Sequence, residues 1–169
     1  MPFEGVTEEW RLSGLMAIEG TILDALNRRE RIPIAAVRWG PLGSDEMLQD
    51  APGLRAVDPY DLVVVLVTSG EARQEAGRTR ITSEPFDVAL DSPPLRLAGT
   101  VHLGPGEDEG VLLMSAPELF FPLIRPVVLI EKRAVDLPES EVALVNRGYL
   151  RDVRRIDART MEALRAPPT

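Results

Sequence analysis

The sequence predicts a mainly β protein made of two related halves, with short helices at its margins. Segments in which apolar and polar residues alternate recur along all 169 residues, and glycine- and proline-rich stretches separate them. Similar short motifs also occur in the same order in both halves. We therefore expect two small antiparallel sheets or barrels, formed by residues 1–80 and 81–169 and arranged as a pseudo-twofold unit.

Composition is typical of a soluble globular protein. Hydrophobic residues make up 44% of the chain, which is enough for a core, and the net charge is −8. The absence of cysteine removes disulfides, thiolate nucleophiles and sulfur-based zinc sites. The acidic start lacks a secretory-signal pattern, and the longest apolar run, Leu62 to Val67, is much shorter than a membrane span. We therefore expect a cytoplasmic protein with no membrane insertion.

The first half opens with a strand and a short helix. Alternating residues from Trp10 to Ile18 predict the strand; a helix is the competing interpretation, which Gly14 inside the segment weakens. Thr21 and Asp24 then resemble a capping box. They predict a short helix that ends near Arg29.

An extended segment, a loop and one buried strand complete the first half. Residues 31–39 alternate, and Pro33 favours a position at the edge of a sheet. Residues 40–58 contain many glycine, proline, aspartate and serine residues and predict a loop. The segment from Tyr60 to Val67 is apolar on both faces, so it predicts a central strand.

The second half has the sharper pattern. Residues 71–80 are polar and predict a hairpin tip or a linker between the halves. Strands are predicted at residues 81–90, 95–103, 141–147 and 149–156. Prolines and a glycine-rich loop divide the intervening chain, which predicts short strands at residues 111–114, 119–123 and 127–130. Residues 158–166 predict a terminal helix.

Three motifs are echoed between the halves. Arg11-Leu12-Ser13-Gly14 matches Arg96-Leu97-Ala98-Gly99, and each opens an alternating segment. Further on, Ile32-Pro33-Ile34 matches Phe121-Pro122-Leu123. The segment Leu66-Val67-Thr68-Ser69-Gly70 would then correspond to Leu144-Val145-Asn146-Arg147-Gly148. The spacing differs by a few residues, which a surface loop can absorb. The echoes predict an internal duplication, with chance similarity as the alternative.

Part of the second half resembles a known type of domain. The strand Leu97–Leu103, the turn Phe120-Phe121-Pro122-Leu123 and the strand Val142–Arg147 are similar to those of a small uncharacterised bacterial β-domain family. That resemblance implies no known chemistry. A looser similarity is to Sm-like small barrels, in which Asn146-Arg147-Gly148 would lie in a polar turn. Sm-like barrels that bind RNA depend on positive potential, whereas this chain is acidic overall.

The sequence predicts no catalytic residue, metal site or cofactor. His102 is the only histidine, and it lies out of phase with the apolar residues of its strand. The run Glu107-Asp108-Glu109 reads as a charged loop, because adjacent carboxylates cannot all face one ion. A hydrolase or transferase that uses Thr68 and Ser69 is a rival hypothesis, although no nucleophile or phosphate-binding motif surrounds them.

The sequence favours a non-enzymatic binding, scaffold or regulatory protein that contacts a protein partner or itself. The binding candidates are Asn146, Arg147, Arg151, Arg154, Phe120 and Phe121. The two phenylalanines are either core residues or an exposed docking edge. The alternative function is a small-barrel nucleic-acid or anion binder that uses the carboxy-terminal arginines, although the net acidity makes nucleic acid an unfavoured partner.

Overall fold

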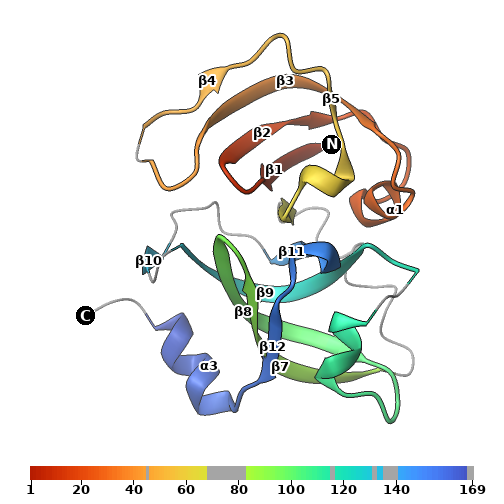
Figure 1. The fold of residues 1–169 in the computed structure, drawn as a ribbon, viewed down its shortest axis with the longest axis vertical. Coiled ribbons are helices and arrows are strands. Elements are labelled where there is room, and N and C mark those ends of the chain that lie inside the picture. The colour runs from red at the N-terminus through yellow and green to blue at the C-terminus, as the bar shows by residue number, and fades with distance from the viewer. Residues whose placement is uncertain (45, 68–82, 115–116, 131–132, 135–140, 167–169) are drawn as a thin grey trace.

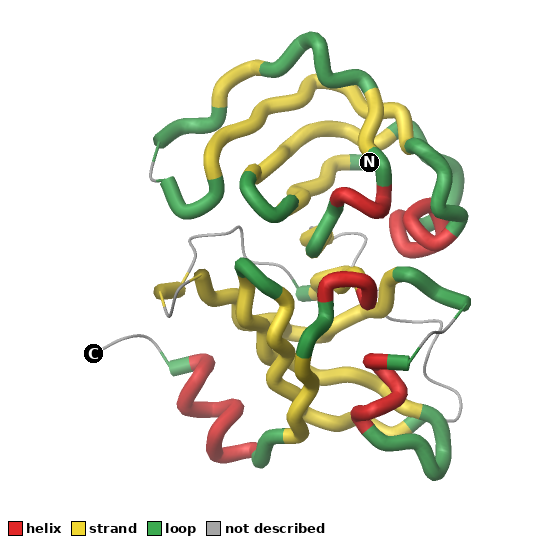
Figure 2. Tube along the Cα trace, viewed as in Figure 1, coloured by secondary structure: helices red, strands yellow, loops and turns green. Residues whose placement is uncertain are grey.

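The protein is mainly β and antiparallel, with a few short helices (Figures 1 and 2). The computed structural model describes residues 1–44, 46–67, 83–114, 117–130, 133–134 and 141–166. The predicted linker at residues 71–80, together with Thr68 and Ser69, lies outside the described residues. None of the described helices has the length and apolar character needed to cross a membrane.

The first six strands and their helices form what we call the first unit, drawn from red to yellow in Figure 1. Its elements are β1 (Pro2–Val6), β2 (Trp10–Met16), α1 (Ile22–Asn27), β3 (Ile32–Pro41), β4 (Gln49–Asp50), β5 (Ala56–Val57), the 3₁₀ helix η1 (Pro59–Asp61) and β6 (Val64–Val67). Helix α1 begins where predicted, because the Thr21 hydroxyl accepts a hydrogen bond from the Asp24 N–H.

The last six strands form the second unit, drawn from green to blue. Its elements are β7 (Glu84–Ser92), β8 (Leu95–Leu103), the 3₁₀ helix η2 (Glu109–Leu113), β9 (Phe120–Ile130), β10 (Arg133–Ala134), β11 (Val142–Asn146), the 3₁₀ helix η3 (Arg147–Tyr149), β12 (Asp152–Arg155) and α3 (Ala158–Arg165). Helix α3 packs against β8, and Asp157 caps its first turn.

The strands form one continuous antiparallel path instead of two separate sheets. The order is β12-β7-β8-β9-β11-β6-β1-β2-β3-β4, with β10 paired to β9 and β5 paired to β3. The units meet where β11 of the second pairs with β6 of the first. The predicted pseudo-twofold arrangement is not seen at this joint. A twofold axis would pair a strand of one unit with the equivalent strand of the other, whereas β6 is the last strand of its unit and β11 is the fifth of its own.

Each pairing inside the first unit has a counterpart six strands later. The pairs β1–β2, β2–β3, β3–β4, β3–β5 and β1–β6 correspond to β7–β8, β8–β9, β9–β10, β9–β11 and β7–β12. In both units a 3₁₀ helix precedes the last strand. The N–H of its second residue donates a hydrogen bond to the side chain of Asp58 in η1 and of Asn146 in η3.

The register also corresponds residue by residue across the β-bulges. In the first unit the bulge lies between the pairs Ser13–Arg38 and Leu15–Ala35, opposite Gly14. In the second unit the bulge lies between the pairs Ala98–Val127 and Thr100–Ile124, opposite Gly99. The same bulge position carries a residue with positive φ in each unit, Ala36 at 51° and Arg125 at 48°. The first two sequence echoes therefore fall on equivalent backbone positions. The third is wrong, because β6 corresponds to β12 and β11 corresponds to β5, and β6 and β11 instead pair with each other.

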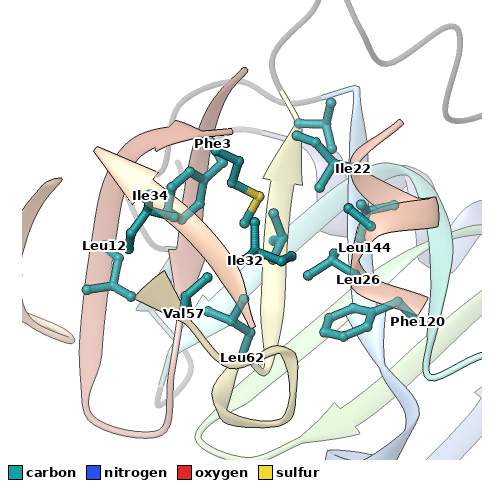
Figure 3. Close-up of a cluster of buried hydrophobic side chains, with 14 of the residues drawn as sticks. Phe3, Leu12, Ile22, Leu26, Ile32, Ile34, Val57, Leu62, Phe120 and Leu144 are labelled. Carbon is teal, nitrogen blue, oxygen red and sulfur yellow. The ribbon is translucent and has the colours of Figure 1, made fainter. Parts of the chain in front are cut away.

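The joint between β6 and β11 contributes to two hydrophobic cores at once. One face, with Val65, Val67, Val142 and Leu144, belongs to the core of the first unit, and Figure 3 shows Leu144 and Phe120 beside Ile22 and Leu26 of α1. The opposite face, with Val64, Leu66, Ala143 and Val145, belongs to the core of the second unit. Each unit therefore completes the core of the other.

Several predictions about individual elements were wrong. Residues 111–114 fall largely in η2 instead of a strand, and residues 59–61 form η1, so the predicted central strand begins only at Val64. That strand is nevertheless central and fully buried, as predicted. The two short strands predicted at 119–123 and 127–130 are one strand, β9, and β3 is not at an edge. Residues 40–58 include the two short strands β4 and β5.

Gly99 is expected to tolerate no side chain. A Cβ atom there would lie 2.6 Å from Leu123 Cγ and 3.0 Å from the Ile124 carbonyl oxygen. Because both belong to packed β9, we expect Gly99→Ala to lower the free energy of unfolding by about 2 kcal/mol. Chemical denaturation checks this, with Gly53→Ala as control, because nothing lies within 4 Å of a Cβ at Gly53. An equal effect of both substitutions would contradict the packing argument.

Candidate functional site

A cavity of about 430 Å³ lies where α1 of the first unit meets the second unit, and we call it the junction pocket. Its apolar wall comes mainly from β8, η2 and β9, and includes Phe120 and Phe121. Its polar lining consists of Asn27, His102, Glu107, Glu118 and Arg147. A cavity of this size with an apolar wall and a few polar groups is typical of a binding site.

Arg147 is the cation of the junction pocket. Its Nη1 donates hydrogen bonds to the carbonyl oxygens of Val111 and Leu112, at 3.2 Å each, and its guanidinium carbon lies 5.1 Å from the centre of the Phe121 ring. Burial lowers the pKa of Arg147, and the negative charges of Glu118 and Glu107 partly oppose that shift. Within the described part of the chain, the buried Nε atom has no hydrogen-bond partner.

Asn27 fixes the start of β9 against α1. Its side-chain oxygen accepts a hydrogen bond from the Phe120 N–H at 2.7 Å, and its amide nitrogen donates to the Phe120 carbonyl oxygen at 3.2 Å. The side chain thus takes the place of a neighbouring strand. As a result Phe120, only 1% exposed, reaches from the second unit into the core of the first.

Asn146 is a structural residue at the joint. Its side-chain oxygen accepts from the Gly148 N–H at 2.8 Å, while its amide nitrogen donates to the carbonyl oxygens of Leu62 at 2.8 Å and Pro59 at 3.4 Å. The side chain is therefore committed to holding η1 and η3 together. It is 1% exposed and so has no surface to offer a ligand.

A second contact joins the same two 3₁₀ helices. The Tyr149 hydroxyl donates a hydrogen bond to the Tyr60 carbonyl oxygen at 2.9 Å. Burial raises the pKa of Tyr149, and the nearby charges of Glu8 and Asp61 raise it further. The phenol therefore remains protonated, and able to donate this bond, to a higher pH than a free tyrosine.

The structure brings together three of the six predicted binding residues. Arg147, Phe120 and Phe121 line the junction pocket, and both phenylalanines are buried. Arg151 and Arg154 are exposed around β12 and do not line the pocket. Arg154 forms an ion pair of 3.3 Å with Asp152, and exposed pairs of this kind contribute little energy. The carboxy-terminal arginines thus do not converge with Arg147.

Sequence reasoning missed three polar residues of the pocket. Asn27 carried no local signal, because its partner Phe120 lies 93 positions away. Glu118 was not singled out, and Glu107 was read only as part of a charged loop; its carboxylate accepts a hydrogen bond from the Gly104 N–H. His102 lines the pocket half-buried, with its Nδ1 atom 3.4 Å from the Ser83 hydroxyl.

Comparison with known proteins adds no family to this description. No family model, curated protein or solved structure matches the chain. Among the described residues, no group of three or more side chains of the metal-ligating types is placed to hold an ion. The geometry of the junction pocket is therefore the basis for the functional proposal.

Proposed function

We propose that the chain is a non-enzymatic binding protein of two related β units, which recognises a protein partner through the junction pocket. An apolar side chain of the partner enters between the residues of η2 and β9. A carbonyl or carboxylate oxygen next to it then accepts a hydrogen bond from the guanidinium of Arg147. The negative charges of Glu107 and Glu118 favour a partner segment that also carries a hydrogen-bond donor or a positive charge.

The anchoring of Arg147 is the observation that carries this proposal. Two carbonyl oxygens and the Phe121 ring hold the guanidinium, so it loses little freedom on binding. Its Nε atom has no partner among the described residues, and a cavity wide enough for a large side chain lies beside the guanidinium. A half-buried arginine beside an aromatic ring is the kind of pair found at the energetic centre of protein interfaces.

The arginine of the junction pocket occurs in only one of the two related units. Equivalent bulges, equivalent positive-φ residues and equivalent capped 3₁₀ helices favour duplication of one ancestral unit. At the position of Arg147, next to the capping residue, the first unit has Pro59. The cationic pocket therefore belongs to the joint and is not a feature repeated in both units.

Peptide selection tests the proposal directly. A phage library of random peptides is selected on the full chain, and the enriched peptides are measured by fluorescence anisotropy. We expect peptides that share one large apolar residue, and we expect Arg147→Met to weaken their binding by about tenfold to a hundredfold, since a hydrogen bond to a charged group is lost. Methionine retains most of the packing volume of the arginine stem.

The matched control is Arg154→Met, which removes an exposed arginine outside the pocket. It should leave the affinity unchanged. Leu23→Trp, which adds bulk to the pocket lining from α1, should weaken binding without touching Arg147. Thermal unfolding confirms that each variant is folded. No enriched peptide, or equal losses in the Arg147 and Arg154 variants, would refute the proposed function.

A further inference from the structure

Helix α3 lies beside the strands of the second unit (Figure 1), and a cavity of about 460 Å³ lies between the helix and β7, β8, β9 and β12. We call it the helix cavity. Ala89 of β7 and Ala98 of β8 lie opposite each other in its lining, and Leu164 lines it from α3. These two small side chains leave space that larger residues would fill. The volume is in the range of small-molecule binding sites.

Three arginines line the helix cavity, and two of them have partners among the described residues. Arg154 forms the ion pair with Asp152. The guanidinium carbon of Arg155 lies 4.0 Å from the centre of the Phe86 ring. Within the described part of the chain, no hydrogen bond or ion pair holds the guanidinium of Arg96. Because Arg96 is exposed on β8, a ligand in the cavity can reach its charge.

The related first unit shows what an arginine at this position binds. Arg11 occupies the position of Arg96, three residues before the bulge glycine of its unit. Its Nε donates a hydrogen bond to the Glu4 carboxylate at 3.2 Å. Glu4 and Ala89 are equivalent, since each follows the residue that lies opposite the bulge glycine. The second unit therefore keeps the arginine, lacks the carboxylate and has open space in its place.

Two aspartates limit the charge of a ligand in the helix cavity. Asp91 lies opposite Arg96 across β7 and β8, although no ion pair joins these two side chains, and opposite Asp152 across β7 and β12. With three arginines and two aspartates, the lining carries one positive charge in excess. A single carboxylate neutralises that excess, whereas a second negative charge would meet the two aspartates.

We infer that the helix cavity binds a small monocarboxylate with an apolar body. The carboxylate of the ligand pairs with Arg96 as the Glu4 carboxylate pairs with Arg11. Its apolar body lies over Ala89 and Ala98 and contacts α3. The helix cavity and the junction pocket share no lining residue, so the inference does not depend on the function proposed for Arg147.

Octanoate is the probe, added to the full chain while amide chemical shifts are followed by nuclear magnetic resonance. We expect saturable shifts at the residues that line the helix cavity. Arg96→Met should weaken binding by about tenfold to a hundredfold, since a hydrogen bond to a charged group is lost. Ala89→Glu should abolish binding, because it supplies Arg96 with the carboxylate that Glu4 supplies in the first unit.

The matched control is Arg159→Met, which removes an exposed arginine of α3 that does not line the cavity and should leave binding unchanged. Thermal unfolding confirms that each variant is folded. Octanol, which lacks the charge, and octyl phosphate, which carries more than one, should each bind at least tenfold more weakly than octanoate. Arg147→Met should leave octanoate binding intact.

Four results would overturn the inference. The first is the absence of saturable shifts with octanoate, and the second is equal binding of octanoate and octanol. The third is an equal loss of affinity in the Arg96 and Arg159 variants. The fourth is a set of shifts confined to the junction pocket and lost in the Arg147→Met chain, because the carboxylate would then bind at Arg147.

Discussion

Replacing Phe120 with alanine is expected to lower the free energy of unfolding by about 4 kcal/mol. The ring belongs to a strand of the second unit but is buried in the core of the first, at 1% exposure (Figure 3). Its removal leaves a cavity among Leu26, Leu144 and their neighbours. Asn27 holds the Phe120 backbone through two hydrogen bonds, so β9 cannot easily shift to fill that cavity. Equilibrium denaturation followed by tryptophan fluorescence measures the loss.

The same substitution tests whether the two units unfold together. Since each unit completes the other's core, we expect the Phe120→Ala chain to keep one cooperative transition at a lower denaturant concentration. Leu113→Ala is the control, because Leu113 is 47% exposed and its truncation should cost less than about 0.5 kcal/mol. A variant in which the first unit unfolds alone, while the second keeps native stability, would show that the cores are independent.

The strands were predictable wherever burial or alternation decided the pattern. Strands β8 and β11 lie within the segments predicted from alternation, and β7 overlaps its predicted segment but extends two residues further, to Ser92. Strand β6 was recognised because both of its faces are apolar. The start of β6 was missed because Tyr60 and Leu62 continue the apolar pattern. Asp58 and Pro59 instead begin a 3₁₀ turn, since an aspartate cap followed by proline favours the first turn of a helix.

Proline was the main source of error in the strand predictions. Pro122 and Pro126 were expected to divide β9, yet the strand continues through both. Pro122 lies beyond Ile124, where the pairing of β9 with β8 ends, so its missing N–H removes no bond to β8. Pro126 lies in the bulge opposite Gly99. Pro33 lies in the equivalent position of β3, just beyond Met16–Ile34, which is the last residue pair between β2 and β3. Only the register explains why these prolines are tolerated.

The candidate site was only partly predictable, because it depends on contacts between distant segments. Arg147 stood out as a cation directly after an apolar strand. Its anchoring by η2 requires the fold, as does the clamp between Asn27 and Phe120. Local charge density was a poor guide, because it grouped Arg151 and Arg154 with Arg147. The turn at η3 directs the chain away from the junction pocket before Arg151 is reached.

Replacing Asn146 with alanine is expected to cost about 3 kcal/mol of stability, the second of the two largest effects. The substitution removes one helix-cap bond to Gly148 and leaves the buried Leu62 carbonyl oxygen without this donor. Asp58→Ala is the matched control, because among the described residues the Asp58 side chain makes only the equivalent cap bond in the first unit, from the Tyr60 N–H. Loss of a cap alone costs about 1 kcal/mol. The difference between the two variants therefore measures the bonds that Asn146 donates across the joint.

The comparison of these two variants also separates local from joint stability. If Asn146 acts across the joint, Asn146→Ala should speed amide hydrogen exchange in both β6 and β11, because the bonds to Leu62 and Pro59 tie η1 to the end of β11. Asp58→Ala should speed exchange only around η1. Equal stability losses and equal exchange patterns in the two variants would mean that Asn146 is no more than a cap. The joint would then be held by the apolar faces of β6 and β11 alone.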